Sequence, residues 1–210
     1  IQSISQIYIV ACGSAWHVGM VAQYVIEDLA KIPVRVELAS EFRYRKPLLD
    51  KNGLVILISQ SGETADTLAA LREAKNRQVK TLAIVNVVGS SIAREADNVF
   101  YTLAGPEISV ATTKAYSAQL IAIYTLALQF AKERNEIEMP EYEKLIKELD
   151  TLPDKIQEVI DNQEEIQKFA AKQAAAKDVF FIGRGIDYAV SHYVEYAPSA
   201  MFDLLPRKFT

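Results

Sequence analysis

A cluster of small polar side chains follows an apolar run in the stretch I-S-Q-S-G-E-T-A-D-T, residues 58–67. The stretch holds four hydroxyls, one glycine and two carboxylates, but no lysine or arginine. Gly62 lets the backbone turn tightly and come close to a ligand. The first amides of a following helix have no partners inside that helix and lie at its positive dipole end. Together with the hydroxyls of Ser59, Ser61 and Thr64, these amides can bind a phosphate monoester without a metal or a cationic side chain.

A simpler interpretation of this stretch is a helix N-terminus capped by Ser61 or Thr64, with Glu63 and Asp66 favourable in the first turn. For an isolated stretch of this kind, the cap is the more common explanation. A nucleotide-binding loop fits less well, because G-x-x-x-x-G-K-[ST] and G-x-G-x-x-G are both absent, and the Gly-Arg-Gly of residues 183–185 lacks a third glycine.

Two other segments are rich in small polar residues, namely residues 12–14 (Cys-Gly-Ser) and residues 109–114 (Ser-Val-Ala-Thr-Thr-Lys). In open α/β sheets, ligands bind at the edge where strands end and helices begin. Three hydroxyl-rich segments at one such edge favour a ligand site over three unrelated helix caps.

The elements that would position these segments alternate between apolar runs and amphipathic stretches, which predicts an open, parallel, three-layer α/β sheet with right-handed crossovers. The expected strands are residues 7–11, 34–38, 54–58, 81–85 and 98–102, with helices at 15–29 and 64–76. Helices are then expected at 111–133, 140–149 and 154–177. Residues 179–182 (Val-Phe-Phe-Ile) resemble the opening strand and predict a second, buried strand that begins an internal repeat.

Composition limits the size of the core, the kinds of binding partner and the cellular location that we expect. A chain of 210 residues that is 50% hydrophobic can bury one full core and begin another. With a net charge of -4 and no basic block, we expect no nucleic-acid binding. Apolar runs too short to span a bilayer predict no membrane segment, and the lone Cys12 fits a reducing, cytoplasmic location. Because the chain opens at Ile1 without a methionine, we expect it to be part of a longer protein.

Several single residues are weaker candidates. Cys12 as a nucleophile competes with Cys12 as a small buried residue, and His17, one turn into its helix, is more often a packing residue than a catalyst. Lys114 at a helix start either faces a ligand or is solvated. The basic cluster of Arg43, Arg45 and Lys46 is most simply a surface feature.

Four motifs together closely resemble the sugar isomerase (SIS) domain and, more narrowly, the first of two such domains in the glutamine–fructose-6-phosphate aminotransferase (glucosamine-6-phosphate synthase) family. The motifs occupy residues 9–14, 39–42, 59–67 and 104–116, and residues 181–185 match the opening of the second domain. The resemblance divides the chain into a first SIS domain of flavodoxin-like type (1–135), linker helices (136–177), the start of a second SIS domain (178–191) and a tail unlike the family (192–210).

The resemblance also implies a ligand and a site. The ligand is fructose 6-phosphate or glucosamine 6-phosphate, bound without a metal or cofactor in a protein that forms homodimers and carries a separate glutaminase domain. By position, the phosphate ligands would be Ser59, Gln60, Ser61, Thr64 and Ser14, and the sugar would be lined by Cys12, Gly13, Val110 and Thr112. Ser14 stands where the family commonly has Thr, and Thr112 where it commonly has Ser, so both positions keep a hydroxyl.

After Ser191 the sequence departs from the family. The segments that carry the family's lysine, its base glutamate and its ring-opening histidine are not matched, and neither His192 nor Glu195 stands in the family's context. We therefore expect no catalytic residue in this chain, which would bind a phosphosugar without turning it over. The alternatives are a non-catalytic SIS sensor of phosphosugars in a transcriptional regulator, although no helix-turn-helix is visible, and a nucleotide-binding α/β domain.

Overall fold

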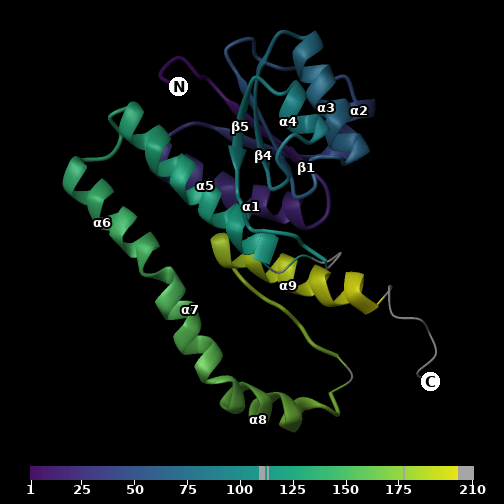
Figure 1. Cartoon of the computed structure of the whole chain (residues 1–210), viewed down its shortest axis with the longest axis vertical. Coiled ribbons are helices and arrows are strands. Elements are labelled where there is room, and N and C mark those ends of the chain that lie inside the picture. The colour runs from purple at the N-terminus through teal and green to yellow at the C-terminus, as the bar shows by residue number, and fades with distance from the viewer. Residues whose placement is uncertain (109–111, 113, 177, 203–210) are drawn as a thin grey trace.

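The computed structural model describes residues 1–108, 112, 114–176 and 178–202, with side chains as far as Tyr196. Five strands form one parallel sheet in the order β2-β1-β3-β4-β5 (Figure 1), which is the flavodoxin-like order. Their bounds are β1 Ile7–Ala11, β2 Val34–Leu38, β3 Leu54–Ser59, β4 Lys80–Val85 and β5 Asn98–Tyr101. The predicted open, parallel α/β sheet is confirmed.

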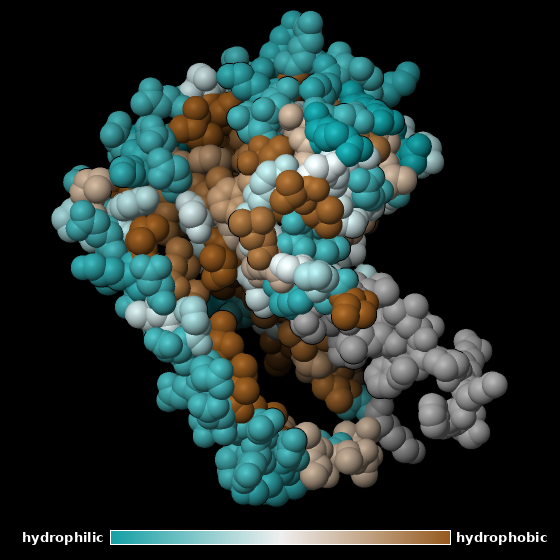
Figure 2. Space-filling view, viewed as in Figure 1, coloured by the Kyte–Doolittle hydropathy of each residue, from teal (hydrophilic) through white to brown (hydrophobic). Residues whose placement is uncertain are grey.

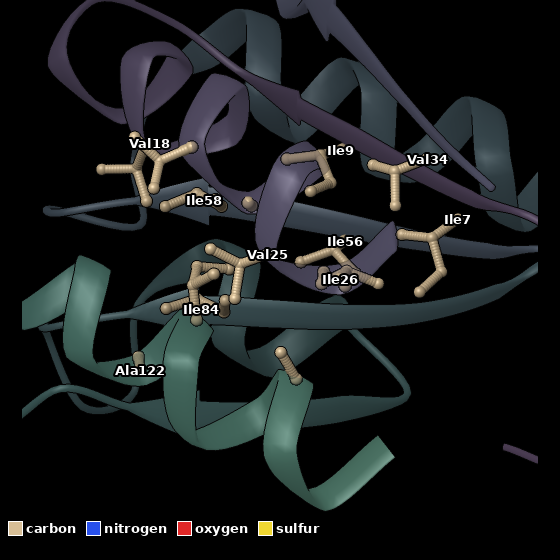
Figure 3. Packing of buried hydrophobic residues seen from close by; sticks show 14 of the residues in the cluster. Ile7, Ile9, Val18, Val25, Ile26, Val34, Ile56, Ile58, Ile84 and Ala122 are labelled. Atoms are coloured by element: carbon tan, nitrogen blue, oxygen red, sulfur yellow. The ribbon is translucent and has the colours of Figure 1, made fainter. Parts of the chain in front are cut away.

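Each face of the sheet packs against its own set of helices. Helices α1 (Ser14–Ala30) and α5 (Lys114–Glu133) cover one face, and α2 (Ala39–Tyr44), α3 (Ala65–Asn76) and α4 (Ser91–Glu95) cover the other. Side chains alternate between faces along a strand, so Ile56 of β3 joins the α1/α5 core while Leu57 joins the α3 core. Figure 3 shows Ile56 and Ile84 of the sheet beside Val25 and Ile26 of α1.

The sequence did not predict the two short helices. Helix α2 has 6 residues and α4 has 5, so neither is long enough to repeat an apolar position over two turns. Helix α5 begins at Lys114, and residues 109–111 and 113, which the sequence assigned partly to this helix, lie outside the described residues.

Three helices form an arm that extends away from the sheet and its covering helices (Figure 1). They are α6 (Met139–Asp150), α7 (Leu152–Asp161) and α8 (Gln163–Gln173), and none contains a buried residue. The prediction of one helix over 154–177 was wrong, because the helix is interrupted at Asn162 and two helices form instead. The Asn162 side-chain amide donates to the carbonyl of Glu158 at 3.1 Å, a local bond that competes with regular helix.

Hydrophobic side chains line the inner side of the arm, as Figure 2 shows. There they border an apolar cavity of about 930 Å³ that α1 and α5 close from the other side, with Tyr24 and Tyr124 among its lining residues. No helix in the described part of the chain is both long and apolar enough to cross a membrane.

The predicted strand at residues 179–182 was wrong. These residues form no strand, and Phe180 and Ile182 are 86% and 90% exposed. A strand needs a neighbour for its amides and carbonyls, and no described strand pairs with this segment. The chain continues into α9 (Ile186–Phe202), which packs against α1.

We predict that Ile56→Ala lowers the free energy of unfolding by about 2–5 kcal/mol, because it leaves a cavity in the central strand. Ile56 is 0% exposed. Urea denaturation followed by circular dichroism measures the change. The matched control is Ile156→Ala in the arm, where the side chain is 52% exposed and the change should be small. Equal losses in the two variants would contradict this description of the core.

Candidate functional site

One pocket lies at the edge of the sheet where β1 and β3 end. Its volume is about 300 Å³, and it is lined by Cys12, Gly13, Ser14, Ala15, Ile58, Ser59, Gln60, Ser61, Thr64, Thr112, Gln119 and Tyr196. All the residues that the sequence assigned to phosphate or sugar are among these except Val110, which lies outside the described residues. The structure therefore brings these residues together, and their roles as ligands remain a prediction.

The loop after β3 holds its hydroxyls in a fixed arrangement. The Ser59 hydroxyl accepts the amide hydrogen of Gly62 at 3.0 Å and lies 3.0 Å from the hydroxyl of Thr64. The Ser61 hydroxyl accepts from the Glu63 amide at 3.2 Å. Because the loop is held by its own bonds, little ordering remains to be done when a ligand binds.

The helix-cap interpretation of this loop does not fit the structure. Thr64 stands at the N-cap position of α3, but no side chain makes a cap hydrogen bond there. The Thr64 hydroxyl lies beside Ser59 instead. The start of α3 thus keeps the unpaired amides and positive dipole end that favour an anion.

Both carboxylates of the loop are turned away from the pocket, since neither Glu63 nor Asp66 lines it. Glu63 accepts the amide hydrogen of Ser91 at 2.7 Å, and this bond lowers the pKa of the Glu63 carboxyl. Asp66 pairs with Arg43 at 2.7 Å. The two negative charges are therefore engaged elsewhere, and the groups presented to a ligand from this loop are uncharged.

The loop after β1 forms the opposite side of the pocket. Gly13 has φ 55° at the N-cap of α1, and Ser14 begins the helix in a buried position. The imidazole of His17 lies on the same helix, and its Nδ1 is 3.0 Å from the Gly13 carbonyl oxygen. The sheet register pairs Ala11 with Ile58, so the loops after β1 and β3 leave the sheet side by side.

Helix α9, for which no role was predicted from the sequence, reaches this pocket. Tyr196 is one of the lining residues. His192 places Nδ1 3.3 Å from Nε2 of His17, and the ring of Tyr193 stacks on Tyr116 with centroids 3.6 Å apart. The i, i+4 spacing of His192 and Tyr196 is the one sequence signal that could have indicated a shared helix face.

The single residues that were weaker candidates in the sequence differ in how close they lie to the pocket. Cys12 is a half-buried free cysteine at the pocket, and His17 is buried at 4% exposure. Lys114 is exposed and does not line the pocket. The basic cluster is a surface feature, as predicted: Arg43 pairs with Asp66, Arg45 with Glu37, and Lys46 is exposed. Gln119 of α5, which the sequence did not single out, lines the pocket and is buried.

A comparison with protein families places this pocket within a known domain. Residues 1–129 match the model of the SIS domain. The chain belongs to the SIS domain family. The family match covers the whole sheet, α1 to α4 and most of α5, and so includes the loops on either side of the pocket.

Similar proteins include one from Clostridium acetobutylicum, "Glutamine--fructose-6-phosphate aminotransferase [isomerizing]", which is 58% identical over 91% of this chain and 31% of its own length. A relative of the same name from Caldanaerobacter subterraneus is 57% identical over 91% and 31% of the two chains. This SIS domain chain thus spans about a third of the curated relatives that it matches.

Solved structures that are similar to this SIS domain chain include two proteins that are named for amino-sugar phosphates. The C-terminal domain of glucosamine-fructose-6-phosphate aminotransferase from Francisella tularensis superposes with a TM-score of 0.87 at 39% identity, covering 91% of this chain and 54% of that one. Glucosamine-6-phosphate deaminase from Thermotoga maritima superposes with a TM-score of 0.59 at 26% identity, over 68% and 44% of the two chains.

We predict that Gly62→Ala destabilises the protein by more than about 2 kcal/mol. The residue has φ 65°, and an added Cβ would lie 2.0 Å from the Ser90 hydroxyl oxygen. A left-handed conformation alone costs about 1–2 kcal/mol for a non-glycine residue. Gly89→Ala is the matched control, because Gly89 has φ 72° and open space around the Cβ position. Equal changes in urea denaturation would contradict a close approach at Gly62.

We also predict that the protein loses stability as pH falls through the range in which histidine titrates. Burial lowers the pKa of His17 below 6.5, with the Gly13 hydrogen bond opposing and His192 adding to that effect. The unfolded chain therefore takes up a proton that the folded chain binds less readily. The free energy of unfolding should fall between about pH 7.5 and about pH 5.5.

Urea denaturation at several pH values measures this dependence. In His17→Gln the slope over the same range should flatten, because that variant has no imidazole to titrate at residue 17. An unchanged slope in His17→Gln would show that another group causes the loss.

Proposed function

We propose that this chain is the phosphosugar-binding part of the isomerase region of a glutamine–fructose-6-phosphate aminotransferase, and that its ligand is fructose 6-phosphate or glucosamine 6-phosphate. The observation that carries the proposal is the pocket at the ends of β1 and β3, where the hydroxyls of two strand-end loops converge. The names of its relatives support the same reading and favour it over a sensor in a transcriptional regulator.

Within this proposal the phosphate lies against the loop after β3. Ser59, Gln60, Ser61 and Thr64 surround it together with the first amides of α3, and Ser14 approaches from α1. Hydrogen bonds to a charged group are about twice as strong as those between neutral groups, so several uncharged donors can hold a dianion without a side-chain cation. The sugar then extends toward Cys12, Gly13 and Thr112, with Val110 assigned there by the family pattern alone.

The chemistry of the whole protein would be the conversion of fructose 6-phosphate and glutamine-derived ammonia into glucosamine 6-phosphate. A proton shift between C1 and C2 requires a positioned acid–base group. Among the described residues that line the pocket there is no Asp, Glu, His, Lys or Arg. We propose that this chain binds the substrate without turning it over, because the family's proton-transfer segments are not matched after Ser191. We further propose a cytoplasmic homodimer whose glutaminase domain lies in another part of the protein.

We predict that fructose 6-phosphate binds to this chain and that Ser61→Ala weakens the binding by about tenfold or more, because a hydrogen bond to a charged group contributes about 1.5–3 kcal/mol. Titration calorimetry measures both affinities. The matched control is Ser3→Ala, an exposed residue at the opposite edge of the sheet, which should leave the affinity unchanged.

Unphosphorylated fructose, titrated in the same way, should bind far more weakly than fructose 6-phosphate. Two results would contradict the proposal: no binding of fructose 6-phosphate by the unaltered chain, or equal affinities in the unaltered chain and Ser61→Ala. Turnover of fructose 6-phosphate by this chain alone would contradict the proposed lack of catalysis.

A further inference from the structure

We infer that Tyr196 of α9 forms the wall of the pocket against the sugar part of the ligand and so helps to select a phosphosugar over a bare phosphate. This inference rests on the proposed function. The inference concerns the part of α9 after Ser191, where the sequence departs from the family. It adds a sugar contact from this part to those of the proposed function.

Tyr196 lies at the pocket, beside the loop after β1. It is the one residue of α9 among the described residues that line the pocket. Its phenol oxygen lies close to the backbone of Gly13, since a Cβ built on that glycine would be 3.1 Å from it. The phenol is therefore at the loop after β1, whereas the hydroxyls proposed to hold phosphate belong mainly to the loop after β3.

Two sets of contacts hold α9 in this place. On one side, the ring of Tyr196 lies 4.8 Å from the ring of His17, which in turn is 3.3 Å from His192 between the nearest nitrogens. On the other side, Tyr193 stacks on Tyr116 of α5 with an interplanar angle of 6°, and its hydroxyl donates to the carbonyl of Thr112. Both α1 and α5 thus fix the helix turn that carries Tyr196.

The hydrogen bonds of the His17 ring show which of its nitrogens carries the proton. The Gly13 carbonyl can only accept, so the proton of neutral His17 is on Nδ1, and Nε2 is left to accept from Nδ1–H of His192. Burial lowers the pKa of His17 and favours this neutral form. Besides His192, the titratable groups that face His17 from α9 are Tyr193 and Tyr196.

The chemistry and the position of the phenol together fit the sugar. A tyrosine ring offers an apolar face to the carbon chain of a hexose and a hydroxyl that can donate to or accept from a sugar hydroxyl. Its hydroxyl lies at Gly13, away from the loop after β3 where the phosphate is proposed to bind. We therefore expect Tyr196 to contribute to the affinity for fructose 6-phosphate while contributing little to the affinity for inorganic phosphate.

The experiment titrates the full chain and its Tyr196→Ala and Tyr196→Phe variants with fructose 6-phosphate and, separately, with inorganic phosphate. For Tyr196→Ala we expect the affinity for fructose 6-phosphate to fall about tenfold and the affinity for inorganic phosphate to stay within about twofold. Tyr196→Phe, which keeps the ring, should lose only part of the fructose 6-phosphate affinity. Tyr188→Ala is the control on the same helix, because Tyr188 is 48% exposed and does not line the pocket.

Each remaining outcome overturns a distinct statement. If Tyr196→Ala leaves fructose 6-phosphate binding unchanged, or strengthens it, Tyr196 is not a sugar contact, while the proposed function stands. A parallel loss of inorganic phosphate binding, or an equal loss in Tyr188→Ala, would show a general disturbance of α9 and would overturn the specific role of Tyr196. If the unaltered chain does not bind fructose 6-phosphate, the proposed function fails and the inference fails with it.

Discussion

The pairing of β1 with β3 is the constraint on which the candidate site depends. These strands are neighbours in space but not in sequence, and their register pairs Ile7 with Leu54 and Ala11 with Ile58. As a result, the chain leaves the sheet at the same level after both strands, and α1 then packs on one face of the sheet and α3 on the other. A register shift of one residue would move the apolar side chains of β3 to the opposite faces and separate the two loops. The hydroxyls of the pocket are thus placed by the buried strands beneath them.

The loop after β3 shows how an anion site can be built beside acidic residues. Glu63 bonds to the first turn of α4, and Asp66 pairs with Arg43. Both interactions also tie the loop to neighbouring helices. The same carboxylates that would repel a phosphate in a disordered loop therefore help to hold this loop in place. The absence of lysine and arginine from the stretch is consistent with a site in which amides and hydroxyls supply the hydrogen bonds.

Much of this arrangement could be predicted from the sequence, because buried parallel strands are marked by short apolar runs such as residues 54–58, and small polar residues directly follow them. The short helices α2 and α4 could not be predicted, since they are too short to show a repeat. The strand expected at 179–182 failed for a different reason: an apolar run forms a strand only where a neighbouring strand completes its hydrogen bonds. The contact of His17 with His192 joins residues 175 apart in the chain, and local patterns carry no information about such a meeting.

The sequence predicted a site at the edge of the sheet, and the structure adds Tyr196 of α9 as an aromatic residue at that site. The central claim nevertheless concerns the loop after β3, and a crystal structure of this chain with fructose 6-phosphate tests it most directly. The account predicts a phosphate group within hydrogen-bonding distance of the Ser61 hydroxyl and of the first amides of α3, with the sugar directed toward Gly13. A phosphate bound elsewhere, such as in the apolar cavity beside the arm, or a sugar bound in the opposite direction, would contradict it.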